Sequence, residues 1–464
     1  MKETVLHKLR EIAGPRSVLL EKEELLRHSC DATRRSELPE VVVCPGNVEQ
    51  VAAVARLCTE ERIPLTPRGA GTGLSGGSVP LEGGVLLSLT GLRRIREIVT
   101  EDLYAVVEAG VVTEELKKAV EISSLFYPPD PASQKTCTVG GNVATSARGL
   151  RSLKYGVTKN YLLGLEIVLP TGEVMKTGGR TVKNVAGFDL TRLVCGSEGT
   201  LALVTAAVLK LIPLPEHRVT LLAGFPDLEQ AARAVSAVMS LGATPSILDV
   251  MDSVSVGVLF RREGNGLPPE AKGHSLLLAE TDGFREAAEQ EAQTLEQVCV
   301  DSGAAFVRRS WDGEEEERLW EERRGLLSAL GKAGPVTVLE DVTVPGSRVG
   351  EMARFVTETG KRHGLRIATF GHAADGNLHP VILLDAPLAE KTPAVQAAVN
   401  GIQQRALSLG GAVPVEYGIG LERAGFLKKE ESGPALETMR RLKASFDPAG
   451  ILNPGKVIPG RVTE

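Results

Sequence analysis

Residues 67–77 read Pro-Arg-Gly-Ala-Gly-Thr-Gly-Leu-Ser-Gly-Gly, and this run decides how the N-terminal half of the chain is interpreted. Five of the nine residues from 69 to 77 are glycine, so few side chains cover the backbone, and its N–H groups can form a nest around an anionic diphosphate. Residues 71–76 also match the G-x-G-x-x-G pattern of Rossmann sites, but that pattern opens a helix, whereas a turn and a strand follow here. We therefore expect a diphosphate-binding loop without a Rossmann helix, and a plain cluster of turns is the alternative.

The bulk composition excludes several classes of protein. At 464 residues the chain is long enough for two or three domains, and its net charge of −6 argues against a nucleic-acid partner. The six cysteines form no C-x-x-C pair, so we expect reduced thiols in a cytoplasmic protein and any iron–sulfur cluster on another polypeptide. No apolar run approaches the ~18 residues of a membrane span, and the early charges between Met1 and Arg10 predict no signal peptide.

The first half of the chain alternates between strand and helix patterns. Short helices are expected over residues 1–37, and a mixed domain over 38–215. That domain begins with a β-α-β unit, in which strands at 41–43 and 63–65 flank an amphipathic helix at 48–62. Further strands are expected at 85–89, 105–108, 164–169 and 201–211.

The second half follows a different order after Pro213-Leu214-Pro215. Over 216–419 we expect an antiparallel sheet with helices on one face, which makes the fold class α+β. The last segment, 420–464, is expected to be a polar helical tail that ends in Asn453-Pro454-Gly455-Lys456. The strands expected in this half lie at 219–224, near 247 and at 275–280, and the helices at 228–241 and 285–302.

Two further clusters of small residues accompany the first glycine loop. Residues 136–149 are almost all small, so a planar ring system could lie against their backbone, and Gly196-Ser197-Glu198-Gly199 precedes a strong strand pattern. One long dinucleotide would need this many contacts. Three such loops can serve it only if the fold brings them together.

Two histidines and a carboxylate form the second candidate site. His372 and His379 lie seven residues apart around a Gly-Asn turn, which suits metal ligands on a loop that folds back, and Glu416 could supply a third ligand. Such a set holds a catalytic divalent cation, whether Zn, Fe(II) or Mn. Ordinary surface or core histidines are the alternative.

The sequence also resembles a known family. The three glycine loops, together with Asp130-Pro131-Ala132-Ser133, Lys154-Tyr155-Gly156 and Gly187-Phe188-Asp189-Leu190, resemble the FAD-binding domain of the vanillyl-alcohol-oxidase (PCMH-type) flavoproteins. The C-terminal half resembles the group of glycolate oxidase flavoprotein subunits, D-lactate dehydrogenases and D-2-hydroxyglutarate dehydrogenases. The resemblance implies a two-subdomain PCMH-type FAD-binding domain, a cap domain with an antiparallel sheet covered by helices, and a C-terminal segment that returns to the flavin.

The resemblance also implies which residues bind FAD. The backbone that would hold the pyrophosphate belongs to Arg68, Gly69, Ala70, Gly71, Thr72, Gly73, Leu74, Ser75 and Gly76. The other residues implied along the cofactor are Pro131, Thr138, Val139, Gly140, Gly141, Ala144, Ser146, Gly149, Tyr155, Glu198, Gly199, Val204 and Asn453. Covalently flavinylated relatives carry a histidine in the first loop, and this loop has none, so we expect non-covalent FAD.

For catalysis, the resemblance implies that Arg323 binds a substrate carboxylate, which the guanidinium fork suits. An exposed helix with i,i+4 charge pairs is the alternative reading of that segment. Asn377 is expected to hold the substrate carboxylate or hydroxyl. The family usually has a histidine, proposed as the base, where this chain has Tyr417, and a tyrosine with a pKa near 10 is a poor base. Ala374 likewise replaces a usual glycine.

The expected function is therefore a dehydrogenase that passes hydride from a small D-2-hydroxy acid, of the D-lactate or glycolate type, to FAD. Its electrons would pass to an electron-transferring flavoprotein or an iron–sulfur subunit, in the cytoplasm or at a membrane reached through that partner. One alternative is a non-catalytic FAD-containing subunit of an electron-transfer complex, which Tyr417 and Ala374 favour. Another is an enzyme for a larger substrate such as an aromatic alcohol, for which Arg323 would be superfluous.

Overall fold

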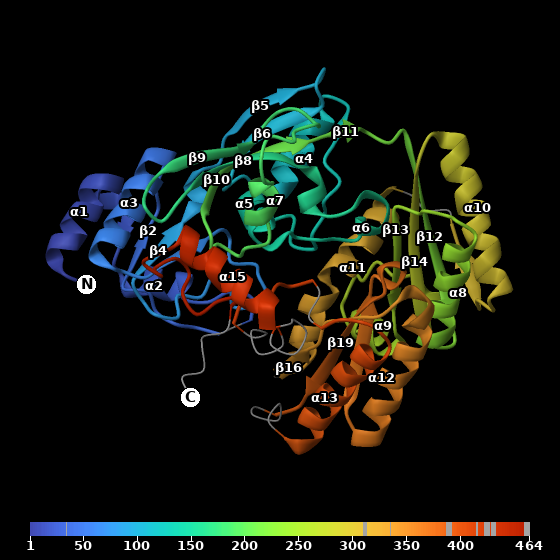
Figure 1. Cartoon of the computed structure of the whole chain (residues 1–464). Helices are drawn as coiled ribbons and strands as arrows, with labels where there is room; N and C mark the ends of the chain where they lie inside the picture. Colours follow the sequence, from blue (N-terminus) through green and yellow to red (C-terminus); the bar gives the residue numbers. More distant parts are fainter. Residues whose placement is uncertain are drawn as a thin grey trace. The chain divides into compact units, whose positions relative to one another are not determined.

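The computed structural model divides the chain into two compact units. The first comprises residues 1–148, 157–214 and 417–464, and the second comprises 149–156 and 215–416. Each unit is interrupted by a segment of the other. Figure 1 colours the chain by residue number, from blue at the N-terminus to red at the C-terminus. The residues that the structure describes are 1–33, 35–309, 313–334, 336–386, 392–413, 416–421, 427 and 433–458, so parts of the expected C-terminal segment lie outside them.

The first unit begins with the expected β-α-β arrangement. Strand β2 (Val41–Val43) and strand β3 (Leu65–Arg68) pair in parallel with β4 (Val85–Ser88), and β1 (Val18–Leu19) adds antiparallel to β2. Helix α3 (Val48–Glu61) connects β2 to β3, with the Asn47 side chain as its N-cap. The buried faces of α3 and of α1 (Glu3–Ala13) pack on this sheet, so the hydrophobic effect holds the N-terminal helix to this unit.

A second sheet completes the first unit. It is antiparallel, in the order β5-β6-β10-β8-β9, with β10 (Leu203–Lys210) at its centre. Two sheets with their helices thus follow each other in the first unit, as the resemblance implies. The remaining elements of the unit are η1 (Pro15–Ser17), α2 (Lys22–His28), η2 (Leu89–Gly91), β5 (Ile95–Val99), β6 (Tyr104–Glu108), α4 (Thr113–Glu121), β7 (Leu125–Phe126), α5 (Val139–Thr145), η3 (Thr158–Tyr161), β8 (Leu162–Val168), β9 (Val174–Gly178), α7 (Leu190–Val194), β11 (Ile212–Pro213) and α15 (Gly433–Phe446).

The C-terminal segment returns to the first sheet of this unit. The backbone N–H of Leu65 donates to the Ile451 carbonyl at 2.8 Å, and the N–H of Asn453 donates to the Leu65 carbonyl at 2.8 Å. Lys443 on α15 places its Nζ between the carboxylate of Asp447 and the carbonyls of Thr200 and Leu452. Buried polar contacts therefore fix residues more than two hundred positions apart.

The second unit is built on an eight-stranded antiparallel sheet in the order β15-β12-β14-β13-β18-β19-β16, with β17 paired to β19. Its elements are α6 (Ser152–Tyr155), β12 (His217–Phe225), α8 (Leu228–Ser240), β13 (Ile247–Met251), α9 (Ser253–Leu259), η4 (Pro269–Ala271), β14 (Ser275–Gly283), α10 (Arg285–Asp301), β15 (Phe306–Arg308), α11 (Gly313–Ala333), β16 (Val336–Leu339), β17 (Val342–Thr343), η5 (Gly346–Arg348), α12 (Val349–His363), β18 (Arg366–Gly371), η6 (Ala373–Asp375), β19 (Asn377–Leu384) and α13 (Pro393–Ser408).

Helices cover both faces of this sheet, which corrects the expectation of one covered face. Leu221 on β12 and Leu277 on β14 pack in a core with α8, α10, α12 and α13. The neighbouring residues Leu222 and Leu276 point the other way, into a second core with α9 and α11. Because successive side chains of a strand alternate between faces, these continuous apolar strands bury both sides. Figure 1 shows helices on either side of the strands.

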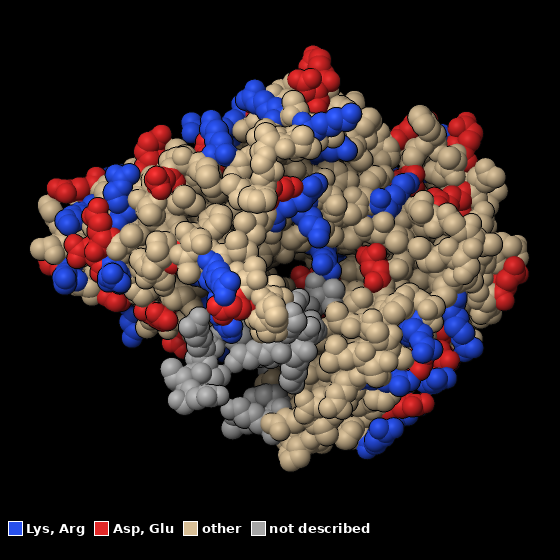
Figure 2. Space-filling model, viewed as in Figure 1, with Lys and Arg blue, Asp and Glu red and all other residues tan. Residues whose placement is uncertain are grey.

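The surface and the cysteines agree with the composition. On the face that Figure 2 shows, Lys and Arg alternate with Asp and Glu over the described residues, and no broad basic surface appears there. The six cysteines are free thiols, and Cys58, Cys137 and Cys299 are buried. Among the described helices, none is both long and apolar enough to cross a membrane.

Candidate active site

The three glycine clusters meet within the first unit. A Cβ on Gly69 would lie 2.5 Å from the Thr138 hydroxyl, and one on Gly199 would lie 2.5 Å from the Pro67 ring, so both approaches require glycine. The N–H of Glu198 donates to the Ala144 carbonyl at 2.8 Å and joins the second cluster to the third. The residues 69–77, 138–146 and 196–200 are called the glycine-loop site below.

The backbone of the first loop is available to a ligand. Over residues 70–77, no backbone N–H donates a hydrogen bond to any other residue that the structure describes. A bound diphosphate could accept hydrogen bonds from such a run of adjacent donors. In the second cluster, the Thr138 side chain caps α5 and accepts from the Gly141 N–H at 3.2 Å. The glycine-loop site therefore fits the diphosphate of FAD.

The C-terminal segment holds this site from one side. The Asn453 amide donates to the Gly77 carbonyl at 2.9 Å and to the Glu198 carbonyl at 2.7 Å. Lys456 is buried, and its Nζ donates to the Val79 carbonyl at 2.6 Å and to Asn453 Oδ1 at 2.7 Å. Burial lowers the pKa of Lys456 to about 8. The expected Asn-Pro-Gly-Lys ending thus ties the first and third glycine clusters together.

Besides its backbone contact to Ala144, Glu198 binds the chain after Tyr417 through its carboxylate. Its carboxylate accepts from the N–H groups of Ile419 at 2.7 Å and Gly420 at 2.9 Å. A Cβ on Gly420 would lie 2.1 Å from the Ser75 carbonyl oxygen, so the chain after Tyr417 is pressed against the first loop. Pro414 and Val415, which precede Glu416, lie outside the described residues.

The remaining residues of the predicted cofactor set fall in both units. Pro131 is buried in a turn of the first unit, and Val204 is buried in β10. Gly149 and Tyr155 belong to the second unit. The Tyr155 hydroxyl donates to Asp282 at 2.8 Å, and burial together with that carboxylate raises the pKa of Tyr155.

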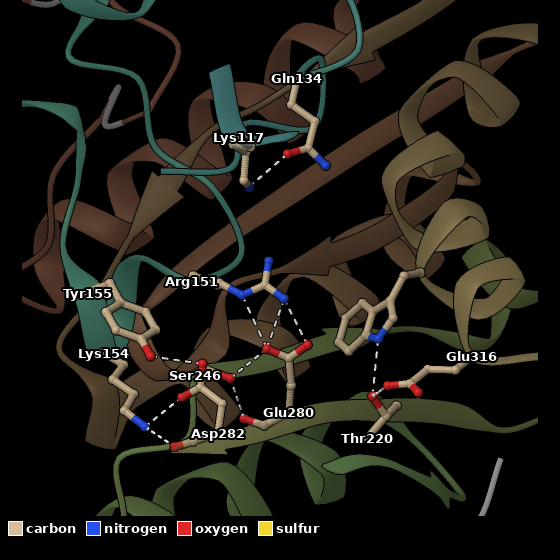
Figure 3. A network of polar contacts seen from close by, with 11 residues as sticks. Lys117, Gln134, Arg151, Lys154, Tyr155, Thr220, Ser246, Glu280, Asp282 and Glu316 are labelled. Atoms are coloured by element: carbon tan, nitrogen blue, oxygen red, sulfur yellow. Dashed lines mark hydrogen bonds and ion pairs between the residues drawn. The ribbon is translucent and has the colours of Figure 1, made fainter. Parts of the chain in front are cut away.

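The short segment 149–156 is anchored by a buried polar network (Figure 3). Arg151 faces Glu280 on β14 with two nitrogens, at 2.8 Å from Nη2 and 3.1 Å from Nε, and Ser246 donates to the same carboxylate at 2.7 Å. Lys154 donates to Asp282 at 2.6 Å. Burial would raise the pKa of Glu280, but Arg151 holds it below its usual value. These pairs explain why the segment belongs to the second unit.

A β-hairpin presents the two predicted histidines in that unit. His372 directly follows β18, and His379 lies within β19, paired with Phe370. The turn η6 ends at Gly376, whose φ of +76° and missing side chain are required, because a Cβ would lie 1.9 Å from the Val344 carbonyl. The hairpin therefore replaces the expected loop, with His372 directly after β18 and His379 within β19.

The hairpin brings the three predicted metal ligands together. One ligand atom from each of His372, His379 and Glu416 lies within 4.8 Å of the others. His379 Nε2 lies 2.9 Å from Glu416 Oε2, and His372 Nε2 lies 3.6 Å from Oε1. The two carboxylate oxygens thus face one imidazole each, and His379 is only 1% exposed.

Two further carboxylates stand behind the histidines, and sequence reasoning missed both. Asp249 Oδ1 lies 2.9 Å from His372 Nδ1, and Asp341 Oδ1 lies 3.6 Å from His379 Nδ1. For Asp249 the available signal was its charge inside the apolar strand 247–251. These two aspartates, the two histidines and Glu416 are called the histidine–carboxylate cluster below.

Arg323 and Asn377 adjoin the same cluster. Arg323 is 4% exposed, which excludes the exposed-helix reading, and its Nε donates to Asp249 Oδ2. Its guanidinium lies 4.9 Å from the Phe370 ring centre. Within the described residues, its two terminal amino groups donate no hydrogen bond. The Asn377 amide donates to Glu416 Oε2 at 3.0 Å.

The pKa values in the cluster reflect its paired charges. Burial would lower the pKa of His372, but Glu416 and Asp249 together raise it to about 10. Burial would raise the pKa of Glu416, and the histidines hold it well below its usual range. The pKa of Asp249 is likewise lowered, because Arg323 and His372 outweigh its burial. The carboxylates around His372 and His379 therefore favour a positive charge, either a proton or a bound cation, between these side chains.

This donor set fits a divalent cation. Two imidazole nitrogens and one carboxylate face a common point, and each imidazole has a carboxylate at its other nitrogen. Outer carboxylates of this kind orient histidines in metal sites and raise their basicity. A bound cation would take the place of the proton that the carboxylates now favour on His372.

Two residues depart from the family pattern, and both lie within the described chain. Tyr417 is half-buried, and the boundary between the units falls between it and Glu416. Ala374 lies in the turn η6 and is not among the residues with positive φ, so its methyl group demands no unusual backbone. His363 ends α12 before Gly364.

Comparisons with known proteins agree with this architecture. The FAD binding domain family matches residues 39–178, and the C-terminal domain family of FAD linked oxidases matches residues 214–457. Among solved structures, p-cresol methylhydroxylase superposes with a TM-score of 0.82 at 20% identity, covering 100% of this chain and 98% of that one. This likeness shows the fold alone and confirms the expected PCMH-type architecture.

Sequence relatives span nearly the whole chain. Glycolate oxidase subunit GlcD of Bacillus subtilis (strain 168) is 40% identical over 454 residues, which are 98% of this chain and 96% of the relative. D-lactate dehydrogenase of Anaerostipes hadrus is 35% identical over 462 residues, which are 98% and 97% of the two chains. This chain therefore belongs to the FAD-linked oxidases and is an FAD-dependent oxidoreductase.

Proposed function

We propose that this protein oxidises a small D-2-hydroxy acid, of the D-lactate or glycolate type, to the 2-oxo acid. One observation carries the proposal: a buried guanidinium and a metal-ligand triad share the carboxylate of Asp249. A carboxylate-binding cation beside a divalent-cation site suits a substrate that carries a carboxylate next to a hydroxyl. The names of the two relatives point to the same substrate class.

The protein side chains have separate roles toward the substrate. The terminal amino groups of Arg323 bind the carboxylate, and the Phe370 ring keeps one face of the guanidinium dry. The Asn377 amide holds Glu416 and orients the substrate hydroxyl or carboxylate. When bound, a divalent cation on His372, His379 and Glu416 polarises the hydroxyl. FAD on the glycine-loop site supplies the hydride acceptor.

Tyr417 is the proposed acceptor of the hydroxyl proton, because it directly follows the ligand Glu416 in the chain. Its backbone neighbours Ile419 and Gly420 are held by Glu198. A phenol with a pKa of about 10 accepts a proton well only when a nearby cation lowers that value. A cation on the triad would have this effect.

Reduced FAD requires an external oxidant. The chain has six separate cysteines and no cluster motif, and the Bacillus subtilis relative is named as a subunit. We therefore assign the electrons to a protein acceptor, either an electron-transferring flavoprotein or an iron–sulfur subunit, in the cytoplasm or at a membrane reached through that partner.

A second candidate is an FAD-containing subunit of an electron-transfer complex without turnover of its own. The replacement of the usual histidine by Tyr417 favours it. The two functions differ in one measurement. Anaerobic stopped-flow mixing with a panel of D- and L-2-hydroxy acids should bleach the flavin absorbance rapidly with one D-acid. A flavoprotein that none of these acids reduces would contradict the dehydrogenase and favour the second candidate.

A further inference from the structure

Asp249 contacts both halves of the proposed substrate site with a single carboxylate. Oδ1 accepts from His372 Nδ1 at 2.9 Å, and Oδ2 accepts from Arg323 Nε. The side chain is 1% exposed and lies on β13, beside the position where β13 pairs with β18 through Val250 and Gly371. Water therefore has little access to replace either contact.

We propose that Asp249 is a positioning residue that fixes His372 in the tautomer able to bind a metal, and that Arg323 sets the orientation of the Asp249 carboxylate for this task. The inference rests on the metal site proposed above. It adds a coupling between the group that binds the substrate carboxylate and the group that binds the cation.

Donor and acceptor rules impose the tautomer. An ionised carboxylate can only accept, so Nδ1 of His372 must carry a hydrogen toward Asp249, and Nε2, which faces Glu416, is the nitrogen that can give up its hydrogen to bind a metal. Arg323 can only donate, so it always occupies one oxygen of residue 249. Residue 249 must therefore offer an acceptor to both neighbours at once.

An asparagine at position 249 cannot meet both demands. Its single oxygen would face Arg323 Nε, because a guanidinium accepts nothing, and its amide nitrogen would then donate to His372 Nδ1. The hydrogen on the imidazole would move to Nε2, which could no longer bind a metal. The same tautomer reversal follows the Asp→Asn change in the catalytic triad of serine proteases.

Removing the arginine as well should restore metal binding. In the double variant Asp249→Asn with Arg323→Met, the amide is free to rotate and can offer its oxygen to His372 Nδ1. The methionine fills a similar volume without a charge, so no buried cation is left unpaired. The affinity for a metal should then recover even though the substrate-binding cation is gone. A purely structural or electrostatic role of Asp249 predicts no such recovery.

The test uses chelator-treated holoenzyme and isothermal titration calorimetry with Co²⁺. We expect Asp249→Asn to weaken Co²⁺ binding by about tenfold to 100-fold, the usual effect of losing an outer carboxylate. The double variant should bind Co²⁺ within about threefold of Arg323→Met alone, a non-additive result typical of side chains in contact. The matched control is Asp341→Asn, beside the other imidazole, whose Co²⁺ affinity Arg323→Met should leave unchanged.

Two results would overturn the inference. Co²⁺ binding by Asp249→Asn within about twofold of wild type would show that residue 249 does not position His372. A double variant as weak as Asp249→Asn would show that Arg323 does not set the orientation of residue 249. These outcomes are independent of turnover: if no hydroxy acid reduces the flavin but the Co²⁺ pattern holds, the proposed substrate is wrong and the positioning role stands. If wild type binds no Co²⁺, the proposed metal site itself is wrong.

Discussion

The glycine-loop site and the histidine–carboxylate cluster are built from different parts of the chain. The first presents backbone N–H groups on residues 70–77, and its contacts depend on missing side chains, as at Gly69 and Gly199. The second presents five charged or ionisable side chains on paired strands and their connecting segments. The comparison predicts that adding a methyl group breaks the first site, whereas removing a charge at constant shape breaks the second.

The largest effect should follow from Glu416→Gln. This change keeps the shape but removes the charge that faces both imidazoles, so the site should lose its metal. Metal activation contributes several kcal/mol, and flavin reduction by the best D-acid should fall about 1,000-fold. Metal analysis and stopped-flow absorbance measure both effects, with Glu351→Gln on helix α12 as the control. If Glu416→Gln keeps its metal and its rate of flavin reduction, Glu416 is not a metal ligand.

Arg323→Lys should act on substrate binding more than on the rate constant. A hydrogen bond to a charged group contributes ~1.5–3 kcal/mol, so KM should rise about tenfold to 100-fold while kcat changes less. Arg318→Lys, exposed on the same helix α11, is the matched control. An unchanged KM would favour a substrate without a carboxylate, such as an aromatic alcohol.

Tyr417→His should raise the rate of flavin reduction at neutral pH. Imidazole titrates near pH 6.5 and is a better base there than a phenol, although the gain should stay below the ~100-fold that a general base typically contributes. Rates measured from pH 6 to 9 would show the change. No gain, or a loss, would mean that Tyr417 has a role of its own.

Gly420→Ala should weaken FAD binding and leave the metal site intact. The φ of Gly420 is +47°, and the added methyl would lie 2.1 Å from the Ser75 carbonyl oxygen, so the first glycine loop must move. A left-handed alanine costs ~1–2 kcal/mol, which corresponds to a five- to 30-fold weaker Kd for FAD. Gly401→Ala on α13, where a Cβ meets nothing within 4 Å, is the control. Full FAD retention by Gly420→Ala would argue against a backbone-built site.

The last prediction concerns the pH dependence of stability at Lys456, which ties the C-terminal segment to the glycine-loop site. Burial lowers its pKa to about 8, so between pH 8 and about 10.4 the unfolded chain binds more protons at this residue than the folded one. The free energy of unfolding should therefore rise with pH in that window, by up to ~1.4 kcal/mol per pH unit from this group. Urea denaturation of wild type and Lys456→Met should show this slope only in wild type, and parallel pH profiles would contradict it.

The sequence predicted the local elements of the first unit well. Most elements of the first unit lie within a few residues of their expected bounds, including the β-α-β unit and its helix at 48–62. Hydrophobic periodicity and turn residues are local signals, so the sequence alone reveals them. The expected strand at 63–65 instead begins at Leu65. Residue type alone singled out His372, His379 and Glu416, and the structure places one ligand atom of each within 4.8 Å of the others, while their metal-binding role stays a prediction.

The parts that could not be predicted depend on long-range pairing. Asp249 meets His372 only because β13 pairs with β18, a contact that spans 123 residues of sequence. The second face of the sheet is covered by α9 and α11. The hydrophobic pattern within one strand does not indicate which helices pack on which face. The hairpin around Gly376 was expected to be a loop, because His372 after β18 and Asn377 and His379 at the start of β19 interrupt the apolar pattern.

The most direct test of the account is to remove the metal without removing the flavin. Because one site is made of backbone and the other of side chains, dialysis against a chelator should leave the FAD absorbance unchanged but abolish its anaerobic bleaching by the best D-2-hydroxy acid. Adding back a divalent cation should restore bleaching. Chelated, metal-free protein that is still bleached at the original rate would contradict the metal-dependent mechanism and the role of the histidine–carboxylate cluster.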